Sequence, residues 1–214
     1  NELFLSLLTI SEMREPIIEI GCGTGKHLKL LEMAGKRKLT GIDISSNSLK
    51  IAKTYLRQSK LQPGDATDLE EFKDSLFNTV ICAGVAHHTP LPEKVFGECA
   101  RICKKEGMII FAVYRKYSIY YWDYLLFNKI VKLIFKLGIE RLFYPLFRLW
   151  FLFLDGNWAD NKLLLAKVTD RYLSPVVRFF TFNELKKWIE ENNLSLIKQS
   201  FICRKSLYTL LLEK

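Results

Sequence analysis

Three glycines and an acidic residue near the start of the chain have the types and spacing that a nucleotide-binding loop requires. The segment Glu19–Gly25 reads Glu-Ile-Gly-Cys-Gly-Thr-Gly and joins an apolar stretch, Pro16–Ile20, to a helix expected to begin near Lys26. Glycines allow a tight turn and a close approach to a ligand, and the helix N-terminus offers unpaired N–H groups. The spacing is G-x-G-x-G, whereas a dinucleotide fingerprint requires G-x-G-x-x-G. The carboxylate of Glu19 would therefore meet a cation rather than a pyrophosphate.

A second carboxylate stands at the expected end of the next strand. The apolar stretch Leu39–Ile42 leads into Asp43, which would place this side chain at the carboxyl edge of a parallel sheet. A carboxylate there could accept both hydroxyls of a ribose. The pattern continues along the chain, because Gly64-Asp65-Ala66 follows a short strand-like stretch and Thr79–Ala83 is expected to form a fourth strand. That strand runs into the loop Gly84-Val85-Ala86-His87-His88-Thr89-Pro90.

As a set, residues 16–114 resemble the class I S-adenosylmethionine-dependent methyltransferases, in particular those of types 11 and 25, and Glu19–Gly25 is similar to their motif I. The resemblance implies S-adenosyl-L-methionine as the cofactor and S-adenosyl-L-homocysteine as the product. It also implies that residues near Asp65 contact the adenine amino group. The residues that the resemblance places at the cofactor are Glu19, Gly21, Cys22, Gly23, Gly25, Asp43, Ile44, Asp65, Ala66, Cys82 and Ala83.

Two side chains are candidates for the chemistry itself. Transfer of a sulfonium methyl group is an in-line attack, in which proximity and orientation supply most of the acceleration. A hydroxyl or phenol acceptor would benefit from a general base, and His88, in the loop after the fourth strand, is the natural choice. Tyr114, at the end of the fifth strand, is the second candidate. The alternative is structural for both: His87 or His88 would shape its loop through backbone hydrogen bonds, and Tyr114 would belong to the core.

The five cysteines, at positions 22, 82, 99, 103 and 203, form no C-x-x-C pair. Reduced thiols are therefore expected, as in a cytoplasmic protein. Cys99 and Cys103 would share a helix face, but no second pair supplies the remaining ligands of a metal site. We expect buried structural thiols and no metal.

The elements that must position these residues alternate between strands and helices, which predicts an α/β fold with a parallel sheet. With 214 residues, 49% of them apolar, one domain spanning 1–214 is expected. The resemblance implies a Rossmann-like, seven-stranded, mostly parallel sheet in the order 3-2-1-4-5-7-6, with strand 7 antiparallel. Expected local features are a helix cap at Ser45 or Ser46, Pro92 in a first turn, a capping box at Thr181–Glu184, a hairpin of 194–203 with 207–212, and a helical segment within 3–10 that covers the cofactor pocket.

Residues 116–178 differ from the rest of the chain, and we call this segment the insert. Residues 117–158 hold 14 of the 28 aromatic residues, and the insert carries 10 Lys/Arg against 5 Asp/Glu, within a total net charge of +9. Uncharged stretches such as Leu149–Leu154 are far shorter than the roughly 18 to 20 residues of a membrane span. Lys129, Lys132 and Lys136 form a basic stripe on an amphipathic helix, and a second helix is expected from near Glu140 to Asp155-Gly156.

Three explanations of the insert remain open at this stage. Its apolar faces could pack as a lid on the domain or on a second copy of the chain. They could attach the protein peripherally to a membrane surface, which the mixture of Trp/Tyr and Lys/Arg favours. The basic stripe could instead contact nucleic acid. In the resembled fold an insert after strand five lies over the substrate side of the pocket, so an apolar or amphiphilic acceptor is expected.

The expected function is methyl transfer to a small, apolar or amphiphilic molecule such as a lipid, a quinone or a natural product, on oxygen, carbon or nitrogen. Two alternatives stay open. Gly21–Leu28 also resembles wobble-uridine tRNA methyltransferases, and the net charge of +9 suits a polyanion. The second alternative is a non-catalytic relative that binds the cofactor, or that binds only a partner protein through the insert.

Overall fold

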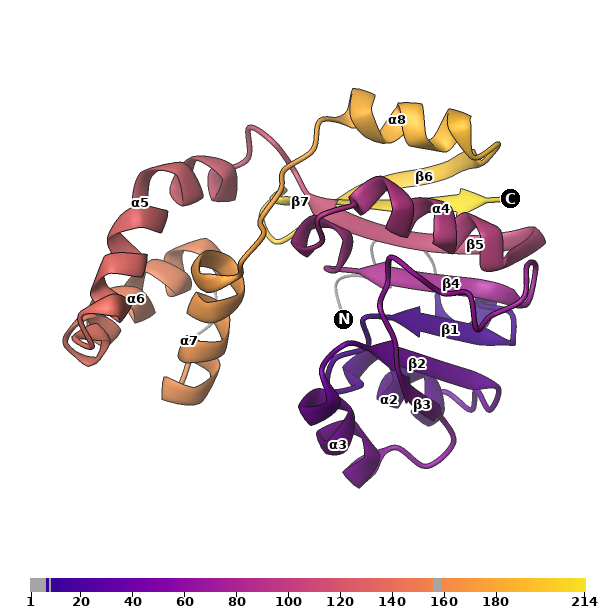
Figure 1. Ribbon diagram of the computed structural model, residues 1–214, viewed down its shortest axis with the longest axis horizontal. Coiled ribbons are helices and arrows are strands. Elements are labelled where there is room, and N and C mark those ends of the chain that lie inside the picture. Colours follow the sequence, from indigo (N-terminus) through magenta and orange to yellow (C-terminus); the bar gives the residue numbers. More distant parts are fainter. Residues whose placement is uncertain (1–6, 8, 156–158) are drawn as a thin grey trace.

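The computed structural model describes residues 7, 9–155 and 159–214, which form a seven-stranded sheet flanked by helices (Figure 1). The strand order is β3-β2-β1-β4-β5-β7-β6, and β7 runs antiparallel to both of its neighbours. The expected order and the expected C-terminal hairpin are therefore confirmed. The strands are β1 (Ile17–Ile20), β2 (Leu39–Asp43), β3 (Lys60–Pro63), β4 (Phe77–Ala83), β5 (Cys103–Tyr114), β6 (Ser195–Ile202) and β7 (Leu207–Glu213).

Four helices cover the two faces of this sheet. They are α2 (Lys26–Met33), α3 (Ser46–Tyr55), α4 (Pro92–Ile102) and α8 (Phe182–Glu191). Because successive side chains of a strand point to opposite faces, β1 serves two cores. Ile18 and Ile20 pack in one cluster with side chains of α4 and α8, whereas Ile17 packs in the other with side chains of α2 and α3. The central strands are buried on both faces, as parallel sheets require.

The helix ends follow the sequence signals. The amide of Ser48 donates to the Ser45 hydroxyl at 3.2 Å and caps α3, and Pro92 occupies the first turn of α4. Thr181 and Glu184 form the expected capping box of α8, in which the Thr181 amide donates to the Glu184 carboxylate at 2.7 Å. These caps fix the residues at which α3, α4 and α8 begin.

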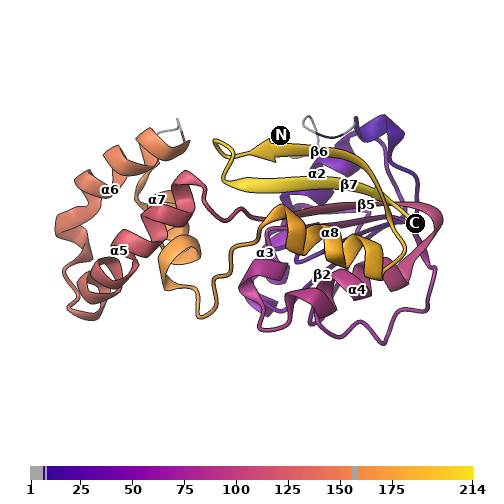
Figure 2. The same cartoon turned by 90° about the horizontal axis from the view of Figure 1, so that it is seen from above.

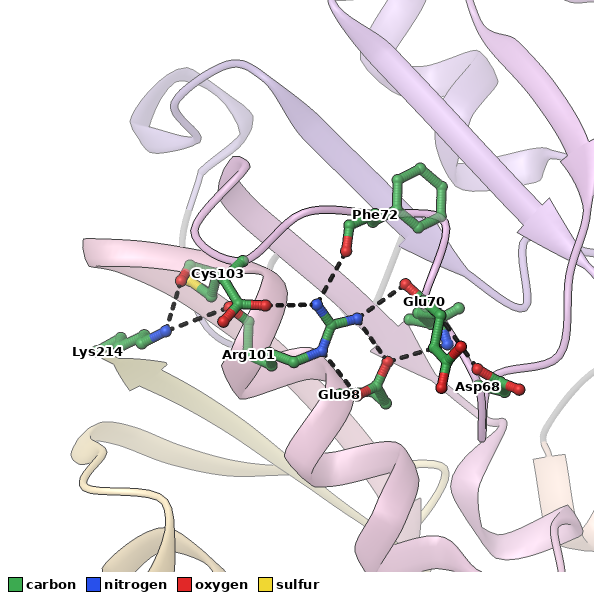
Figure 3. A network of polar contacts seen from close by, with 9 residues as sticks. Asp68, Glu70, Phe72, Glu98, Arg101, Cys103 and Lys214 are labelled. Atoms are coloured by element: carbon green, nitrogen blue, oxygen red, sulfur yellow. Dashed lines mark hydrogen bonds and ion pairs between the residues drawn. The ribbon is translucent and has the colours of Figure 1, made fainter.

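Arg101 fixes the long segment between β3 and β4 against α4 (Figure 3). Its guanidinium donates to the carbonyls of Leu69 and Phe72 at 2.8 and 2.9 Å and to both carboxylate oxygens of Glu98 at 2.8 Å. It also donates to Asp74 at 2.7 Å. One side chain thus satisfies two backbone carbonyls and two carboxylates. This network holds the segment that leads out of the sheet edge at Gly64–Thr67.

The insert forms a helical cluster of its own beyond the edge at which β1 ends (Figure 1). It contains α5 (Ile119–Lys136), α6 (Glu140–Asp155), α7 (Asn161–Val168) and the π-helical turn η3 (Thr169–Leu173). The first two helices were expected and are confirmed, although Gly156 lies outside the described residues. The sequence analysis did not anticipate α7, which begins where Asp160 accepts the Leu163 amide at 2.7 Å. The four elements share a small core that includes Val131, Phe151, Leu164 and Tyr172.

The faces of the insert are only partly covered. Val131 and Ile134 are buried, whereas Ile130 and Leu133 are more than half exposed, and the stripe of Lys129, Lys132 and Lys136 faces solvent. None of the helices described in 7, 9–155 and 159–214 combines the length and apolarity that a membrane span needs. The helix expected within residues 3–10 lies largely outside the described residues; Ile10–Glu12 form a 3-10 turn, η1.

Candidate active site

A cavity of about 320 Å³ opens at the carboxyl edge of the sheet, where loops after β1, β2, β3 and β4 meet. Five of the expected cofactor residues line it: Gly21, Asp43, Ile44, Asp65 and Ala66. The proposed base His88 lines it as well. The remaining lining residues, which the sequence analysis did not assign to the cofactor, are Gly64, Thr67, Gly84, Val85, Thr89 and Pro90. The location matches the rule that ligands of open α/β sheets bind at the carboxyl ends of strands.

The glycine loop has the geometry that its sequence predicts. Gly21 has a φ of +68°, and a Cβ atom added there would lie 2.1 Å from Cγ2 of Val85, so the loops after β1 and β4 touch only because this residue has no side chain. Gly25 has a φ of +76° and is the N-cap of α2; its added Cβ would meet Leu56 at 2.6 Å. Gly23 lies between them, and its added Cβ would meet no atom within 4 Å. The middle of the loop therefore presents bare backbone.

Asp43 organises this loop from the end of β2. Its Oδ2 accepts the Gly23 amide at 2.7 Å, and its Oδ1 accepts the Ser45 amide at 2.8 Å. Each carboxylate oxygen has a second lone pair, so Asp43 can still accept hydrogen bonds from a ligand in the cavity. The position fits a ribose, whose two hydroxyls are both donors.

Glu19 is a buried carboxylate with one satisfied oxygen. Its Oε1 pairs with Nδ1 of His27 at 2.6 Å, while its buried Oε2 has no hydrogen-bond partner among the described residues. Burial raises the pKa of Glu19, although His27 opposes the shift. A buried carboxylate oxygen without a donor is costly, and it fits a cationic ligand group such as an ammonium. The residues present thus fit S-adenosylmethionine, whose methionine end carries such a group.

The other expected cofactor residues lie behind the lining. Cys22 is buried between α2 and β2, and burial raises the pKa of its thiol to about 12. Cys82 is fully buried in the core beneath α4, and Ala83 packs against the opposite core. Cys99 and Cys103 are also buried, as expected, but Cys103 begins β5 instead of continuing the helix of Cys99. No cluster of three or more metal-binding side chains occurs in the described part of the chain.

The two catalytic candidates meet on a residue of the insert. His88 Nε2 lies 3.5 Å from Oδ1 of Asp170, and the Tyr114 hydroxyl donates to Oδ2 of the same carboxylate at 3.1 Å. His88 Nδ1 donates to the Val176 carbonyl at 2.9 Å, because a carbonyl can only accept. The sequence analysis gave Asp170 no role. Its position directly before Arg171-Tyr172 was the available signal.

The surroundings shift the pKa values of His88 and His87 in opposite directions. Burial opposes a charge on His88, but Asp170 and the Val176 carbonyl outweigh it, so the pKa of His88 is raised above its ordinary value of 6.5. Burial lowers the pKa of the neighbouring His87 well below that value, which keeps His87 neutral. Burial and the nearby Asp170 raise the pKa of Tyr114 well above its ordinary value. Tyr114 is thus a hydrogen-bond donor at neutral pH, and its ring lies 3.6 Å from that of His87.

The strand order, the left-handed glycine loop and the acidic residue closing β2 are together those of the class I S-adenosylmethionine-dependent methyltransferases. Comparison with known proteins agrees. Residues 18–111, less than half of the chain, match the family described as "Methyltransferase domain", and in fold and site this region is similar to the methyltransferases of this class.

Curated relatives match stretches of about 100 residues of the chain. The chain is 34% identical over 100 residues to a phosphatidylethanolamine N-methyltransferase of Cereibacter sphaeroides, covering 44% of this chain and 48% of the relative. It is 30% identical over 104 residues to a ubiquinone biosynthesis O-methyltransferase of Nitrosomonas europaea, covering 45% and 42%. The chain thus spans about half the length of the curated relatives it matches.

Solved structures share the fold. A S-adenosylmethionine-dependent methyltransferase from Thermotoga maritima matches with a TM-score of 0.61 at 17% identity, over 95% of this chain and 84% of that one. The magnesium protoporphyrin IX methyltransferase of Synechocystis, solved with bound S-adenosylhomocysteine, matches with a TM-score of 0.55 at 16% identity, over 92% and 72%. At these identities the likeness establishes the fold alone.

Proposed function

We propose that this protein transfers the methyl group of S-adenosylmethionine to a small apolar or amphiphilic acceptor. One observation carries the choice of acceptor: Asp170, which contacts His88 at the cofactor cavity, belongs to the aromatic and apolar insert. The acceptor would therefore approach the cavity along apolar side chains. The names of the curated relatives, which refer to phosphatidylethanolamine and to ubiquinone, support the same class.

Residues of the first two loops would hold the cofactor. Glu19 Oε2 would accept from the ammonium, the bare backbone at Gly23 would allow close approach, and Asp43 would accept from the ribose hydroxyls. Ile44 is 76% exposed at the cavity and would cover one face of the adenine. When bound, S-adenosylmethionine supplies an electrophilic methyl group on a sulfonium.

His88 would take the proton of a hydroxyl or phenol acceptor. Because Nδ1 donates to Val176, the neutral ring carries its free lone pair on Nε2, which is buried and lies 3.5 Å from Oδ1 of Asp170, so the acceptor hydroxyl would have to reach Nε2 beside this carboxylate. A proton accepted at Nε2 turns this contact into an ion pair, so Asp170 stabilises the imidazolium that proton transfer creates. Tyr114 donates to the other oxygen of Asp170 and orients the carboxylate. Asp170 and Tyr114 would thus act through His88.

The exposed face of α5 and α6 supports contact with a lipid surface. Exposed Leu126, Ile130 and Leu133 lie on the same helix as the exposed Lys129 and Lys132. Apolar side chains flanked by lysines suit the interface of an anionic membrane. Sedimentation with phosphatidylglycerol vesicles but not with phosphatidylcholine vesicles is expected. Equal recovery in both, or a stable dimer in analytical ultracentrifugation, would favour self-association through residues 117–158 instead.

The direct test uses S-adenosylmethionine labelled in its methyl group. The protein is incubated with a cell extract, which is then separated into lipid, polar small-molecule and tRNA fractions. Label in the lipid or small-molecule fraction is expected, and Asp43→Ala should abolish it. Label in tRNA would replace the proposal with tRNA modification, for which activity should fall steeply with salt. Cofactor binding without transfer to any fraction would indicate a non-catalytic relative.

A further inference from the structure

A second cavity lies inside the insert, the helical cluster at the left of both views, and is lined by side chains of α5, α6 and the turn η3 (Figures 1 and 2). Its volume is about 260 Å³. All of its lining residues are aliphatic or aromatic: Phe127, Ile130, Val131, Ile134, Phe143, Leu146, Phe147, Trp150 and Tyr172. A cavity of this composition does not hold ordered water, because it offers water no hydrogen-bond partners.

The two lining residues that carry polar atoms direct those atoms away from the cavity. Trp150 Nε1 donates to Oδ1 of Asp123 at 2.7 Å, and the Tyr172 hydroxyl donates to Oδ2 at 2.5 Å. Asp123 is itself 3% exposed and lies on α5. The buried carboxylate therefore occupies both donors at once. What remains for a ligand is the hydrocarbon surface of the two rings.

The cavity is open on its apolar side. Ile130 and Leu146 line it and are 54% and 61% exposed, so its mouth lies at the exposed face of α5 and α6. An apolar chain could enter there without crossing a polar barrier. Leaving such a surface unfilled costs dispersion contacts that packed cores make, which favours occupation by an apolar group.

The turn η3 joins this cavity to the active site. Tyr172 forms part of the apolar wall, and Asp170, two residues earlier in the same turn, contacts His88 and Tyr114. Between them, Arg171 packs over the rings of Tyr120 and Phe151 at 4.8 and 5.0 Å. A π-helical turn of this kind is frequent at functional sites. One short element thus borders the apolar cavity and also contacts His88 and Tyr114.

We propose that this cavity holds the apolar tail of the acceptor, an acyl or isoprenoid chain, while the acceptor's reactive head group lies at His88. The inference rests on the proposed function for the role of the tail, but tail binding itself needs neither cofactor nor turnover. It narrows the acceptor to an amphiphile with a hydrocarbon chain. Apolar molecules that lack a polar head would bind without being methylated.

The test is binding of cis-parinaric acid, a fatty acid whose fluorescence rises in an apolar site, to the whole chain without cofactor. Saturable binding is expected. Val131→Phe, which fills the cavity, should raise the dissociation constant at least tenfold. Ile130→Trp, at the exposed mouth, should do the same without disturbing the core, and it serves if Val131→Phe does not fold. Leu142→Trp is the matched control, because Leu142 is 77% exposed on α6 and does not line the cavity.

Displacement separates the two sources of a hydrocarbon chain: dodecanoic acid should compete if the site takes acyl tails, and farnesol if it takes isoprenoid tails. No saturable binding, or equal weakening by Ile130→Trp and Leu142→Trp, would overturn the proposal. Binding of S-adenosylhomocysteine, measured in parallel, should be unchanged in all three variants. If S-adenosylhomocysteine fails to bind the parent protein while parinaric acid binds the cavity, the proposed function fails and the apolar site stands.

Discussion

Replacing Asp43 tests the cofactor assignment most directly, because its carboxylate links the structure of the loop to the proposed ribose contact. In the parent protein it accepts the amides of Gly23 and Ser45 at 2.7 and 2.8 Å. Two further hydrogen bonds from ribose hydroxyls to a charged acceptor would contribute about 1.5–3 kcal/mol each. Asp43→Ala should thus weaken binding of S-adenosylhomocysteine by about 3–6 kcal/mol, on the order of 10²- to 10⁴-fold.

Isothermal titration calorimetry measures this change, with Asp68→Ala as the control, since Asp68 is an exposed aspartate outside the cavity lining. Loss of the two backbone partners could also disturb the loop, so a second ligand separates the effects. An analogue of S-adenosylhomocysteine without ribose hydroxyls should bind the parent protein more weakly by a similar factor, while Asp43→Ala should barely distinguish the two ligands. A dissociation constant for Asp43→Ala within threefold of the parent value would refute the assignment.

Four further outcomes follow from the same contacts. Burial raises the pKa of Glu19 above its ordinary 4.5, so the folded protein loses stability as pH rises from 4.5 through the raised pKa and Glu19 ionises. Glu19→Gln should flatten this loss in thermal melts and should weaken S-adenosylhomocysteine binding. A variant that is less stable than the parent protein at pH 7 would contradict this prediction. Gly21→Ala should unfold at lower temperature than Gly23→Ala, since both have positive φ but only the former meets Val85; equal melting temperatures would mean the contact relaxes freely. If His88 is a base, activity should fall as pH falls through its raised pKa, because the ring becomes protonated. Asp170→Asn removes a group that raises this pKa, so the rise of kcat/KM with pH should move to lower pH. An unchanged pH profile would show that Asp170 takes no part in the mechanism. Arg101→Met should lower the free energy of unfolding, measured in urea, by roughly 2–4 kcal/mol, because it removes the hydrogen bonds to two carbonyls and to Glu98. The control Lys186→Met, which breaks an exposed ion pair with Glu190, should cost less than about 0.5 kcal/mol. Similar losses in both variants would show that the Arg101 network does not stabilise the fold.

The backbone geometry of the glycine loop and the place of Asp43 could be predicted because their signals are local. Glycines at alternate positions, an acidic residue closing a strand and a hydroxyl before a helix each act within a few residues. The side chains of Cys22 and Cys82 were harder to place. Whether a side chain beside the loop faces the ligand or the core depends on which face of the sheet it points to and on the helices that cover that face. Both thiols point into the core.

The structure of the insert could be predicted from local sequence only in part. Periodicity predicted α5 and α6, since apolar and basic residues recur at helical spacing, but α7 is short and its only strong signal is the cap at Asp160. Aromatic content indicated an apolar role without indicating a cavity. Asp123 accepts hydrogen bonds from Trp150 and Tyr172, which line the cavity from separate elements, and this arrangement depends on α5, α6 and η3 packing together.

The class of fold, the order of the sheet through resemblance, the glycine loop and the carboxylates on it could be predicted from the residues alone, because these depend on backbone conformation and on residue spacing along one strand or helix. The contacts of Asp170 with His88 and Tyr114, and the apolar cavity beside the same turn, are visible only in the folded chain. Such contacts join residues far apart in the chain, and their free energy is gained only when whole helices have docked against the edge of the sheet.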